Sequence, residues 1–302
     1  MTVEKPNEQS LAMAHAMAMD RSRRRWRLFA IVSFLLIAFW WSGYSSGMPS
    51  DDEPYIAHVN IHGMITQNLN QEKTLDRLAA NENVKAVIIH VDSPGGTMVG
   101  GLSLYHAIQR IKSEKPVVAV MGSTAASAGY LISLATSYIF ANEATATGSI
   151  GVLIPLVDFS TLAERLGIKA NFITSGDLKT AGLPLEKMSE KSKDYLQSMV
   201  NDMEKIFVSY LTKHRKVTPK TLALVKDGRA IIGNDAKELN LIDELGGIHE
   251  AKNWLIENHK ISKEIPLIHR ELEQKKPLLE QILGEAHIFS KKIVSSLFVY
   301  GI

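Results

Sequence analysis

The sequence predicts an α/β fold with a mainly parallel sheet. From Tyr55 onward, short apolar segments alternate with segments whose apolar residues recur at helical spacing. The segment Val87–Val91 is apolar almost throughout, as expected for a strand that is covered on both faces. Such an alternation of strands and helices favours parallel β-α units. The 302 residues, of which 45% are hydrophobic and 22% charged, suffice for one or two globular cores.

The order of these segments gives the expected elements. Strands are predicted near residues 55–61, 84–91, 116–121, 138–141, 146–154 and 169–174. Helices are predicted near residues 70–80, 98–113, 127–136, 159–166 and 189–214, with shorter helices near 218–226, 233–239 and 248–258.

A transmembrane helix is expected before this domain. Residues 28–47 contain no charge and are long enough to cross a bilayer, which needs roughly 20 residues. Arginines precede the segment and Asp51, Asp52 and Glu53 follow it, so the positive-inside rule places the N-terminus in the cytoplasm. A cleavable signal peptide is the alternative. It is disfavoured because more than 20 residues precede the apolar run and no clear Ala-x-Ala site follows it.

The expected organisation has five parts. They are a cytoplasmic tail (1–27), the transmembrane anchor (28–47), a linker (48–54), the catalytic domain (55–258) and a C-terminal tail (259–302). Apolar residues at helical spacing after Pro277 predict an amphipathic helix, which either packs on a protein surface or lies on a membrane. A net charge of +2 gives no sign of a nucleic-acid partner, and the absence of cysteine excludes disulfides and thiolate-zinc sites.

The first candidate site is Asp92-Ser-Pro-Gly-Gly96, which lies between an expected strand and an expected helix. Glycines allow a sharp turn and expose backbone N–H groups, and a helix N-terminus adds partial positive charge. The turn therefore suits a developing oxyanion, with the N–H of Gly96 as the donor. The alternative is a plain strand-to-helix turn without chemistry.

Ser127 lies in a second turn of the same kind, after the expected strand 116–121. Its hydroxyl would be the nucleophile, and the N–H of Ala128 would be the second oxyanion donor. Taken alone, Ser127 is an ordinary helix N-cap. Two consecutive strand-turn-helix units that each offer an N–H favour the catalytic interpretation.

A nucleophilic serine needs a base, and histidine is a poor candidate here. The next histidine after Ser127 is His214. Lysine is the main alternative, and Lys179 in Ser175-Gly-Asp-Leu-Lys179 is the candidate, although any one lysine is by default a surface charge. It would have to act as a neutral amine, which burial favours. Ser149, in the turn Thr147-Gly-Ser-Ile-Gly151, can hydrogen-bond such an amine and hold it in place.

No metal or cofactor is expected. The histidines His58, His62, His90 and His106 are isolated in the sequence, and none has metal-ligand spacing with another ligand residue.

Together these motifs resemble the signal peptide peptidase A family of membrane-anchored serine peptidases. The matching segments are 92–96, 123–130, 147–152, 175–179, 227–229 and 241–246. The resemblance covers roughly residues 55–255 and implies a Clp-protease/crotonase-like fold of stacked β-β-α units. One departure is that Ala128-Gly129 replaces the two glycines that often follow the family's serine.

The resemblance also implies roles for the site residues. Ser127 would be the nucleophile, Lys179 the general base and Ser149 the residue that steadies the lysine, with Gly96 and Ala128 as oxyanion donors. The implied substrates are cleaved signal peptides and other membrane or envelope polypeptides. Short members of the family form rings in which neighbouring protomers complete each active site, with the catalytic domain outside the bacterial cytoplasmic membrane.

Three alternatives remain. A crotonase-like acyl-CoA enzyme shares the two-donor oxyanion hole, but it would need an acidic pair for hydratase chemistry and has no need of a membrane anchor. A Clp-type Ser-His-Asp protease needs a histidine soon after the serine. In a non-catalytic membrane scaffold, Ser127 would cap a helix and Lys179 would be a surface charge.

Overall fold

The computed structural model of the protein describes residues 26–27, 29–36 and 53–272, and the chain divides into two units, Met1–Glu53 and Pro54–Ile302. In the first unit residues 26–27 and 29–36 are helical, and Trp26 and Phe34 are each 71% exposed. Most of the expected anchor, 28–47, lies outside the described residues. Within the part of the chain that is described, no helix combines the length and the apolar character that crossing a membrane requires.

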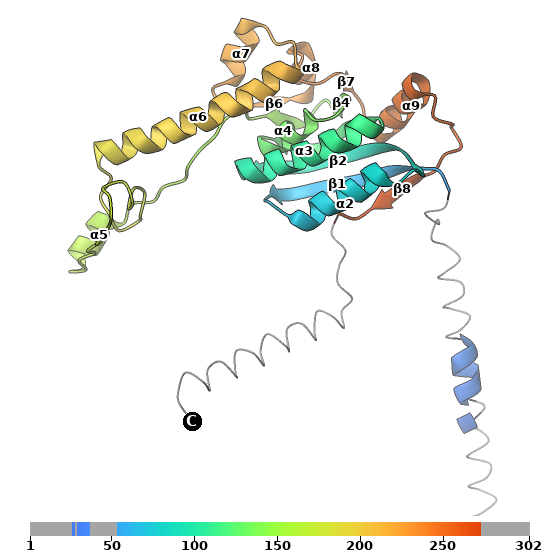
Figure 1. The fold of residues 1–302 in the computed structure, drawn as a ribbon, viewed down its shortest axis with the longest axis horizontal. Coiled ribbons are helices and arrows are strands. Elements are labelled where there is room, and N and C mark those ends of the chain that lie inside the picture. The colour runs from blue at the N-terminus through green and yellow to red at the C-terminus, as the bar shows by residue number, and fades with distance from the viewer. Residues whose placement is uncertain (1–25, 28, 37–52, 273–302) are drawn as a thin grey trace, which may run out of the picture. The chain divides into compact units, whose positions relative to one another are not determined.

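The second unit is built on one mixed sheet of eight strands (Figure 1). The strands are β1 (Tyr55–Ile65), β2 (Val84–Gly96), β3 (Val117–Ala126), β4 (Tyr138–Ala141), β5 (Ala146–Gly148), β6 (Ala230–Ile232), β7 (Glu244–Leu245) and β8 (Leu267–Arg270). The order is β6-β5-β3-β2-β1-β8, with β4 also paired to β3 and β7 paired to β4. Among the described strands, only β5 and β6 pair antiparallel. The predicted α/β class with a mainly parallel sheet is confirmed.

Eight helices of this unit are described, and four of them begin at a polar side-chain cap. They are α2 (Leu69–Ala80), α3 (Met98–Glu114), α4 (Ala128–Ser133), α5 (Ser160–Arg165), α6 (Glu190–His214), α7 (Pro219–Val225), α8 (Gly233–Glu238) and α9 (Ile248–His259). The side chains of Asn68, Thr97, Ser189 and Thr218 accept hydrogen bonds from the first backbone N–H groups of α2, α3, α6 and α7. Each cap satisfies donors that have no partner inside the helix, so these residues fix where the helices begin.

The core lies on both faces of the sheet, as the apolar strands predicted. Along β2, Val87, Ile89 and Val91 belong to the cluster that contains the buried residues of α2, α3 and α4. The alternate residues Ala86 and Ile88 belong to a second cluster with α9. Successive side chains of a strand point to opposite faces, so α2 and α3 cover one face of the sheet while α9 covers part of the other.

Two strand predictions are wrong. Residues 169–174 form no strand and are exposed, because no other strand lies beside them to pair with. In the expected strand 146–154 only Ala146–Gly148 pairs, and the chain turns at Gly148, whose φ is +74°. The sheet also continues past residue 258, since β8 pairs with Ile56–Val59 of β1.

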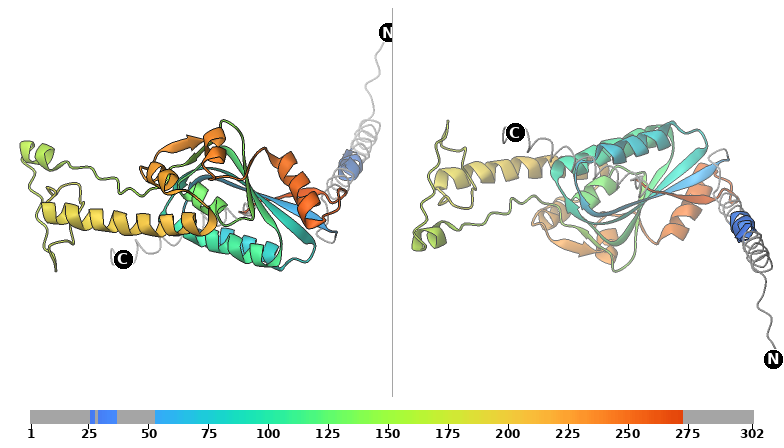
Figure 2. Two further views of the ribbon diagram at one scale, coloured as in Figure 1. Left: turned by 90° about the horizontal axis from the view of Figure 1, so that it is seen from above. Right: turned by 90° about the horizontal axis from the view of Figure 1, so that it is seen from below.

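Residues 152–206, which we call the arm, extend away from the sheet (Figures 1 and 2). The arm contains α5 and most of α6. Of the 25 residues of α6, only Ser192, Phe207 and Leu211 are buried, and the last two belong to the main core cluster. Helix α6 is therefore held by its C-terminal end and carries the rest of the arm outward.

Candidate active site

Ser127 has a strained backbone at the junction of β3 and α4. Its φ is 51° and its ψ is −119°, a region that costs a non-glycine residue about 1–3 kcal/mol and is found mainly at functional sites. Its N–H donates to the carbonyl oxygen of Gly148 at 2.9 Å, which holds the turn in place. The Ser127 side chain makes no capping hydrogen bond to α4. The helix-cap interpretation therefore does not account for this serine.

The turn that ends β2 lies against Ser127. A Cβ added to Gly95, whose φ is +120°, would be 2.7 Å from the Cβ and 3.2 Å from the Oγ of Ser127. Ser93 holds this turn in place. It is fully buried and was not among the predicted site residues. Its hydroxyl donates to the carbonyl of Gly63 at 2.6 Å and accepts from the N–H of Gly95 at 3.1 Å. The N–H of Gly95 is thus already engaged.

The backbone around Gly96 is held against β1. The next N–H, of Thr97, donates to the carbonyl of Ile65 in β1 at 2.8 Å. Because backbone N–H groups alternate in direction along a strand, we expect the N–H of Gly96 to point away from β1, toward β3. A Cβ at Gly96 would lie 1.8 Å from the oxygen of Ile65, so no other residue fits this backbone position.

Ala128 begins α4, and the first N–H groups of a helix have no partner within it. The methyl group of Ala128 fits because α3 has a glycine opposite, since a Cβ at Gly101 would lie 3.1 Å from it. Gly129 packs close to the turn that ends β2, because a Cβ added to Gly129 would be 2.9 Å from the backbone oxygen of Ser93. The departure from a glycine pair after the serine is thus accommodated by α3, and the backbone N–H remains.

Ser149 lies beside Ser127 in the same chain. Strands β3 and β5 are parallel neighbours in which Ala126 pairs with Gly148, so the two serines follow paired residues. Ser149 also has a positive φ, 50°, and is half-buried. Its N–H donates to the carbonyl oxygen of Arg229 at 2.9 Å. The backbone just before β6 therefore fixes the position of Ser149.

The turn that presents this carbonyl is closed by an exposed ion pair. The carboxylate of Asp227 accepts from the backbone N–H of Arg229 at 3.0 Å and from its Nε at 2.7 Å. These hydrogen bonds from Arg229 lower the pKa of Asp227. In the sequence analysis, segment 227–229 contributed only to the family resemblance.

Lys179 lies apart from these groups. It is exposed in the arm, and its N–H donates to the carbonyl of Gly176 at 3.0 Å. With Ser175–Leu178 and Lys191 it lines a shallow pocket of about 400 Å³. The segment is attached to the N-terminal end of α6, where Lys191 pairs with Asp177 at 2.9 Å.

The length of α6 indicates how far Lys179 lies from the core of the domain. At 1.5 Å per residue, Lys191 is about 24 Å along the helix from Phe207, the first residue of α6 that packs in the main core. A base must lie about 2.6–3.2 Å from the hydroxyl that it deprotonates. The structure brings Ser127, Ser149, Gly96 and Ala128 together and leaves Lys179 outside the group.

The sequence profile of peptidase family S49 matches residues 109–262, which is half of the chain. The protein belongs to peptidase family S49. The match contains Ser127, Ser149 and Lys179, whereas Gly96 lies before it.

Two curated relatives are each 34% identical to this S49 protein. One, from Methanocaldococcus jannaschii, is named as a candidate protease and aligns over 177 residues, 59% of this chain and 57% of its own. The other, from Enterococcus faecium, is named as a candidate signal peptide peptidase and aligns over 189 residues, 62% of this chain and 55% of its own. The chain thus spans little more than half the length of these relatives. A solved ClpP1 mutant from Listeria monocytogenes covers 64% of this chain and 92% of its own at 18% identity, with a TM-score of 0.44.

The described residues of the S49 protein contain no group of three His, Cys, Asp or Glu side chains that could hold a metal ion. Three histidines do lie in a row on the sheet, with the ring of His58 6.1 Å from that of His90 and 5.4 Å from that of His269. Burial, followed by the effects of His269 and His90, lowers the pKa of His58. This row lies on strands β2, β1 and β8, so it is separate from the turn that holds Ser127.

Proposed function

We propose that this protein is a serine endopeptidase whose active site is completed by two copies of the chain. Ser127 is the nucleophile, Gly96 and Ala128 donate N–H groups to the oxyanion, and Ser149 steadies the base. The base is Lys179 of a neighbouring copy. One observation carries the proposal: a strained serine lies against the turn that ends β2, while the candidate lysine is exposed on an arm that its own chain holds away from the serine.

In the proposed reaction, Lys179 first accepts a proton from Ser127 and then donates it to the leaving group. The neutral amine of Lys179 removes the proton of Ser127 as Oγ attacks the peptide carbonyl, and the oxygen of that carbonyl takes up the negative charge near Gly96 and Ala128. When this intermediate collapses, the C–N bond breaks and the lysine gives its proton to the leaving nitrogen. Water then cleaves the acyl-serine by the same route and restores the enzyme.

The surface of the arm supports the assembly of several copies. Its exposed large hydrophobic side chains are Leu153, Leu156, Val157, Phe159, Leu162, Leu166, Ile168, Phe172, Ile173, Leu183, Leu185, Tyr195 and Ile206. An apolar surface of this extent, on an extension without a core of its own, is typical of a protein–protein contact. We propose that a second copy covers it, and that repetition of this contact closes a ring.

The same family membership supports a proposal for the substrates and the location. A relative named as a signal peptide peptidase supports peptides left in a membrane as substrates. The uncharged segment 28–47 would anchor the chain in the bacterial cytoplasmic membrane, with residues from 55 onward on the extracytoplasmic side. The succession of β-α units on a mainly parallel sheet supports the Clp-protease/crotonase-like assignment of the fold.

Labelling with a fluorophosphonate probe tests the proposal. The wild-type oligomer should be labelled on Ser127, and Ser127→Ala should abolish both labelling and peptide hydrolysis without loss of folding or membrane attachment. Lys179→Ala should also abolish hydrolysis. If the Ser127→Ala variant still reacts with the probe and still hydrolyses peptides, Ser127 is not the nucleophile. Wild-type oligomer that neither binds the probe nor cleaves peptides would favour the scaffold alternative.

A further inference from the structure

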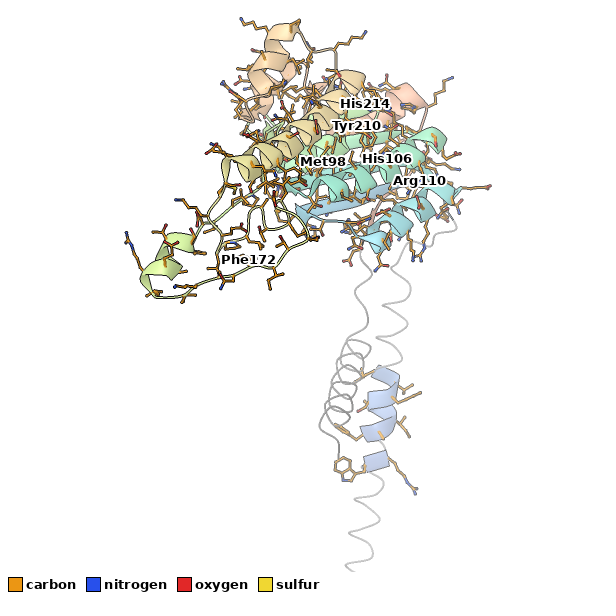
Figure 3. All side chains as sticks on the ribbon, turned by 60° about the vertical axis from the view of Figure 1, so that its left-hand side comes forward. Met98, His106, Arg110, Phe172, Tyr210 and His214 are labelled. Carbon is orange, nitrogen blue, oxygen red and sulfur yellow. The ribbon has the colours of Figure 1, made fainter. Side chains whose placement is uncertain are left out.

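Helix α6 is clamped to α3 by a cluster of aromatic side chains, which we call the aromatic clamp: Tyr105, His106, Tyr210 and His214. The hydroxyl of Tyr105 lies 2.5 Å from Nε2 of His214, and the ring of Tyr105 meets that of Tyr210 edge-on at 4.5 Å. Figure 3 shows His106 beside Tyr210 and His214, with Phe172 in the arm far from all three.

The electrostatics of the clamp keep both partners of the hydrogen bond uncharged. Burial, followed by the charges of Lys112, Lys213 and Arg215, lowers the pKa of His214 to about 4. Burial and Tyr210 raise the pKa of Tyr105. Near neutral pH the imidazole is therefore uncharged and the phenol keeps its proton, so the pair shares one hydrogen bond, in which Tyr105 is the donor when the imidazole proton is on Nδ1. Tyr105 is only 2% exposed, which shields this bond from competing water.

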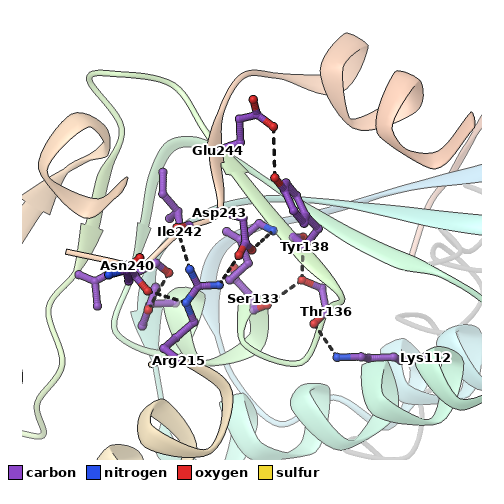
Figure 4. Close-up of polar contacts among 12 residues, drawn as sticks. Lys112, Ser133, Thr136, Tyr138, Arg215, Asn240, Ile242, Asp243 and Glu244 are labelled. Carbon is purple, nitrogen blue, oxygen red and sulfur yellow. Dashed lines mark hydrogen bonds and ion pairs between the residues drawn. The ribbon is translucent and has the colours of Figure 1, made fainter. Parts of the chain in front are cut away.

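The C-terminal end of α6 is also tied to the segment that supports the nucleophile (Figure 4). Arg215 donates to the carbonyl of Asn240 at 2.6 Å and pairs with Asp243 at 2.8 Å. Tyr130 of α4, three residues after Ser127, donates to the carbonyl of Leu241 in the same segment at 2.9 Å. Arg215 is thus linked to both the arm and the serine, whereas the Tyr105–His214 bond joins α6 to α3.

The length of α6 amplifies any movement at the clamp. At 1.5 Å per residue, His214 and Lys191 are about 35 Å apart along the helix, and the loop of Lys179 is attached near Lys191. A tilt of about 5° at the clamp would move that end by roughly 3 Å, and a misplacement of about 1 Å in an active site can cost about 100-fold in rate.

We propose that Tyr105 and His214 are positioning residues, which set the direction of α6 and so place Lys179 at the serine of the neighbouring copy. This inference rests on the proposed shared active site. It makes the Tyr105–His214 bond necessary in the copy that supplies the lysine. The same bond is dispensable in the copy that supplies the serine.

A mixing experiment separates the two copies. Ser127→Ala protomers supply only lysine and Lys179→Ala protomers supply only serine, so each is inactive alone and their mixed oligomers recover part of the activity. Tyr105→Phe, which removes only one oxygen atom, is then added either to the Ser127→Ala chain or to the Lys179→Ala chain. Differently tagged chains and native mass spectrometry verify that mixed oligomers form equally in every case.

The expected result is asymmetric. Tyr105→Phe in the lysine-supplying chain should lower kcat about tenfold or more without changing KM, because the peptide binds beside the serine of the other copy. The same change in the serine-supplying chain should leave kcat within about twofold of the unsubstituted mixture. Tyr210→Phe is the matched control, since its hydroxyl is exposed and 3.4 Å from His106, and it should have little effect in either chain.

Other outcomes would overturn the inference. An equal loss in both placements would mean that Tyr105 acts through the general fold, and a loss confined to the serine-supplying chain would mean that it acts through α3 on the turn of Gly96. No loss in either placement would make the bond irrelevant to the reaction. If the unsubstituted mixture stays inactive while wild type is active, the site lies within one chain, and both the shared site and this inference are wrong.

Discussion

Gly95→Ala tests how closely the turn after β2 is fitted to Ser127. The new methyl carbon would lie 2.7 Å from the Cβ of Ser127, whereas unbonded carbons prefer about 3.5–4.0 Å. One of the two turns must therefore move by about 1 Å. The φ of +120° adds strain, so we expect about 1–3 kcal/mol less stability. A shift of about 1 Å at the nucleophile should lower kcat about 100-fold.

Gly63→Ala is a matched control for this strain. Gly63 also has a positive φ, +71°, but an added Cβ would meet nothing within 4 Å. Both variants should lose stability in urea titrations, and only Gly95→Ala should lose peptide hydrolysis and fluorophosphonate labelling. A Gly95→Ala enzyme with the kcat of wild type would refute the contact between the two turns, and an equal loss of kcat in Gly63→Ala would assign the effect to backbone strain.

Three further predictions concern the surroundings of the site. Arg215→Met should lower the free energy of unfolding by about 3 kcal/mol in urea titrations, because it leaves the half-buried Asp243 without its cation; a loss below about 0.5 kcal/mol would contradict this. The pKa of His214 is lowered to about 4 in the folded protein, so between pH 6.5 and pH 4 the unfolded chain binds more protons than the folded one. The thermal midpoint should therefore fall over this pH range by the equivalent of about 1 kcal/mol, and the fall should be smaller in His214→Gln. If wild type and His214→Gln show the same pH dependence of the thermal midpoint, His214 is not the cause of the fall. Asp227→Ala should loosen the turn that holds Ser149 and lower kcat about tenfold at constant KM in steady-state hydrolysis, whereas an unchanged kcat would separate this turn from the reaction.

The parts of the fold that were predictable are those with long, regular patterns. The strands near 84–91 and 116–121 are apolar on both faces, and the structure covers both faces with helices. The short strands β6, β7 and β8 contain two to four residues, too few to show a period, and depend on partners far away in the sequence. The expected strand 169–174 has an extended, β-prone sequence, but it lies in the arm, where no strand is available to pair with it.

The candidate site divides in the same way. Gly96, Ser127 and Ser149 lie in turns whose residue types predict their geometry, and neighbouring strands bring those turns together. Ser93 was missed because a buried serine in a Pro-Gly-Gly turn looks like any turn residue. Tyr105 and His214 were missed because their contact joins two helices that are distant in sequence. The sequence offers no signal for it beyond a tyrosine on an apolar helix face.

Site-directed cross-linking tests the central claim, that Ser127 of one copy meets Lys179 of another. The chain contains no cysteine, so Ser127→Cys in one tagged copy and Lys179→Cys in another introduce the only thiols. After subunit exchange and treatment with a short bismaleimide, we expect a cross-linked dimer that carries both tags, and peptide mapping should place the link at the two new cysteines. If no such dimer forms in verified mixed oligomers, while the double variant Ser127→Cys/Lys179→Cys is linked within a single chain, each active site is built from one copy and the account is wrong.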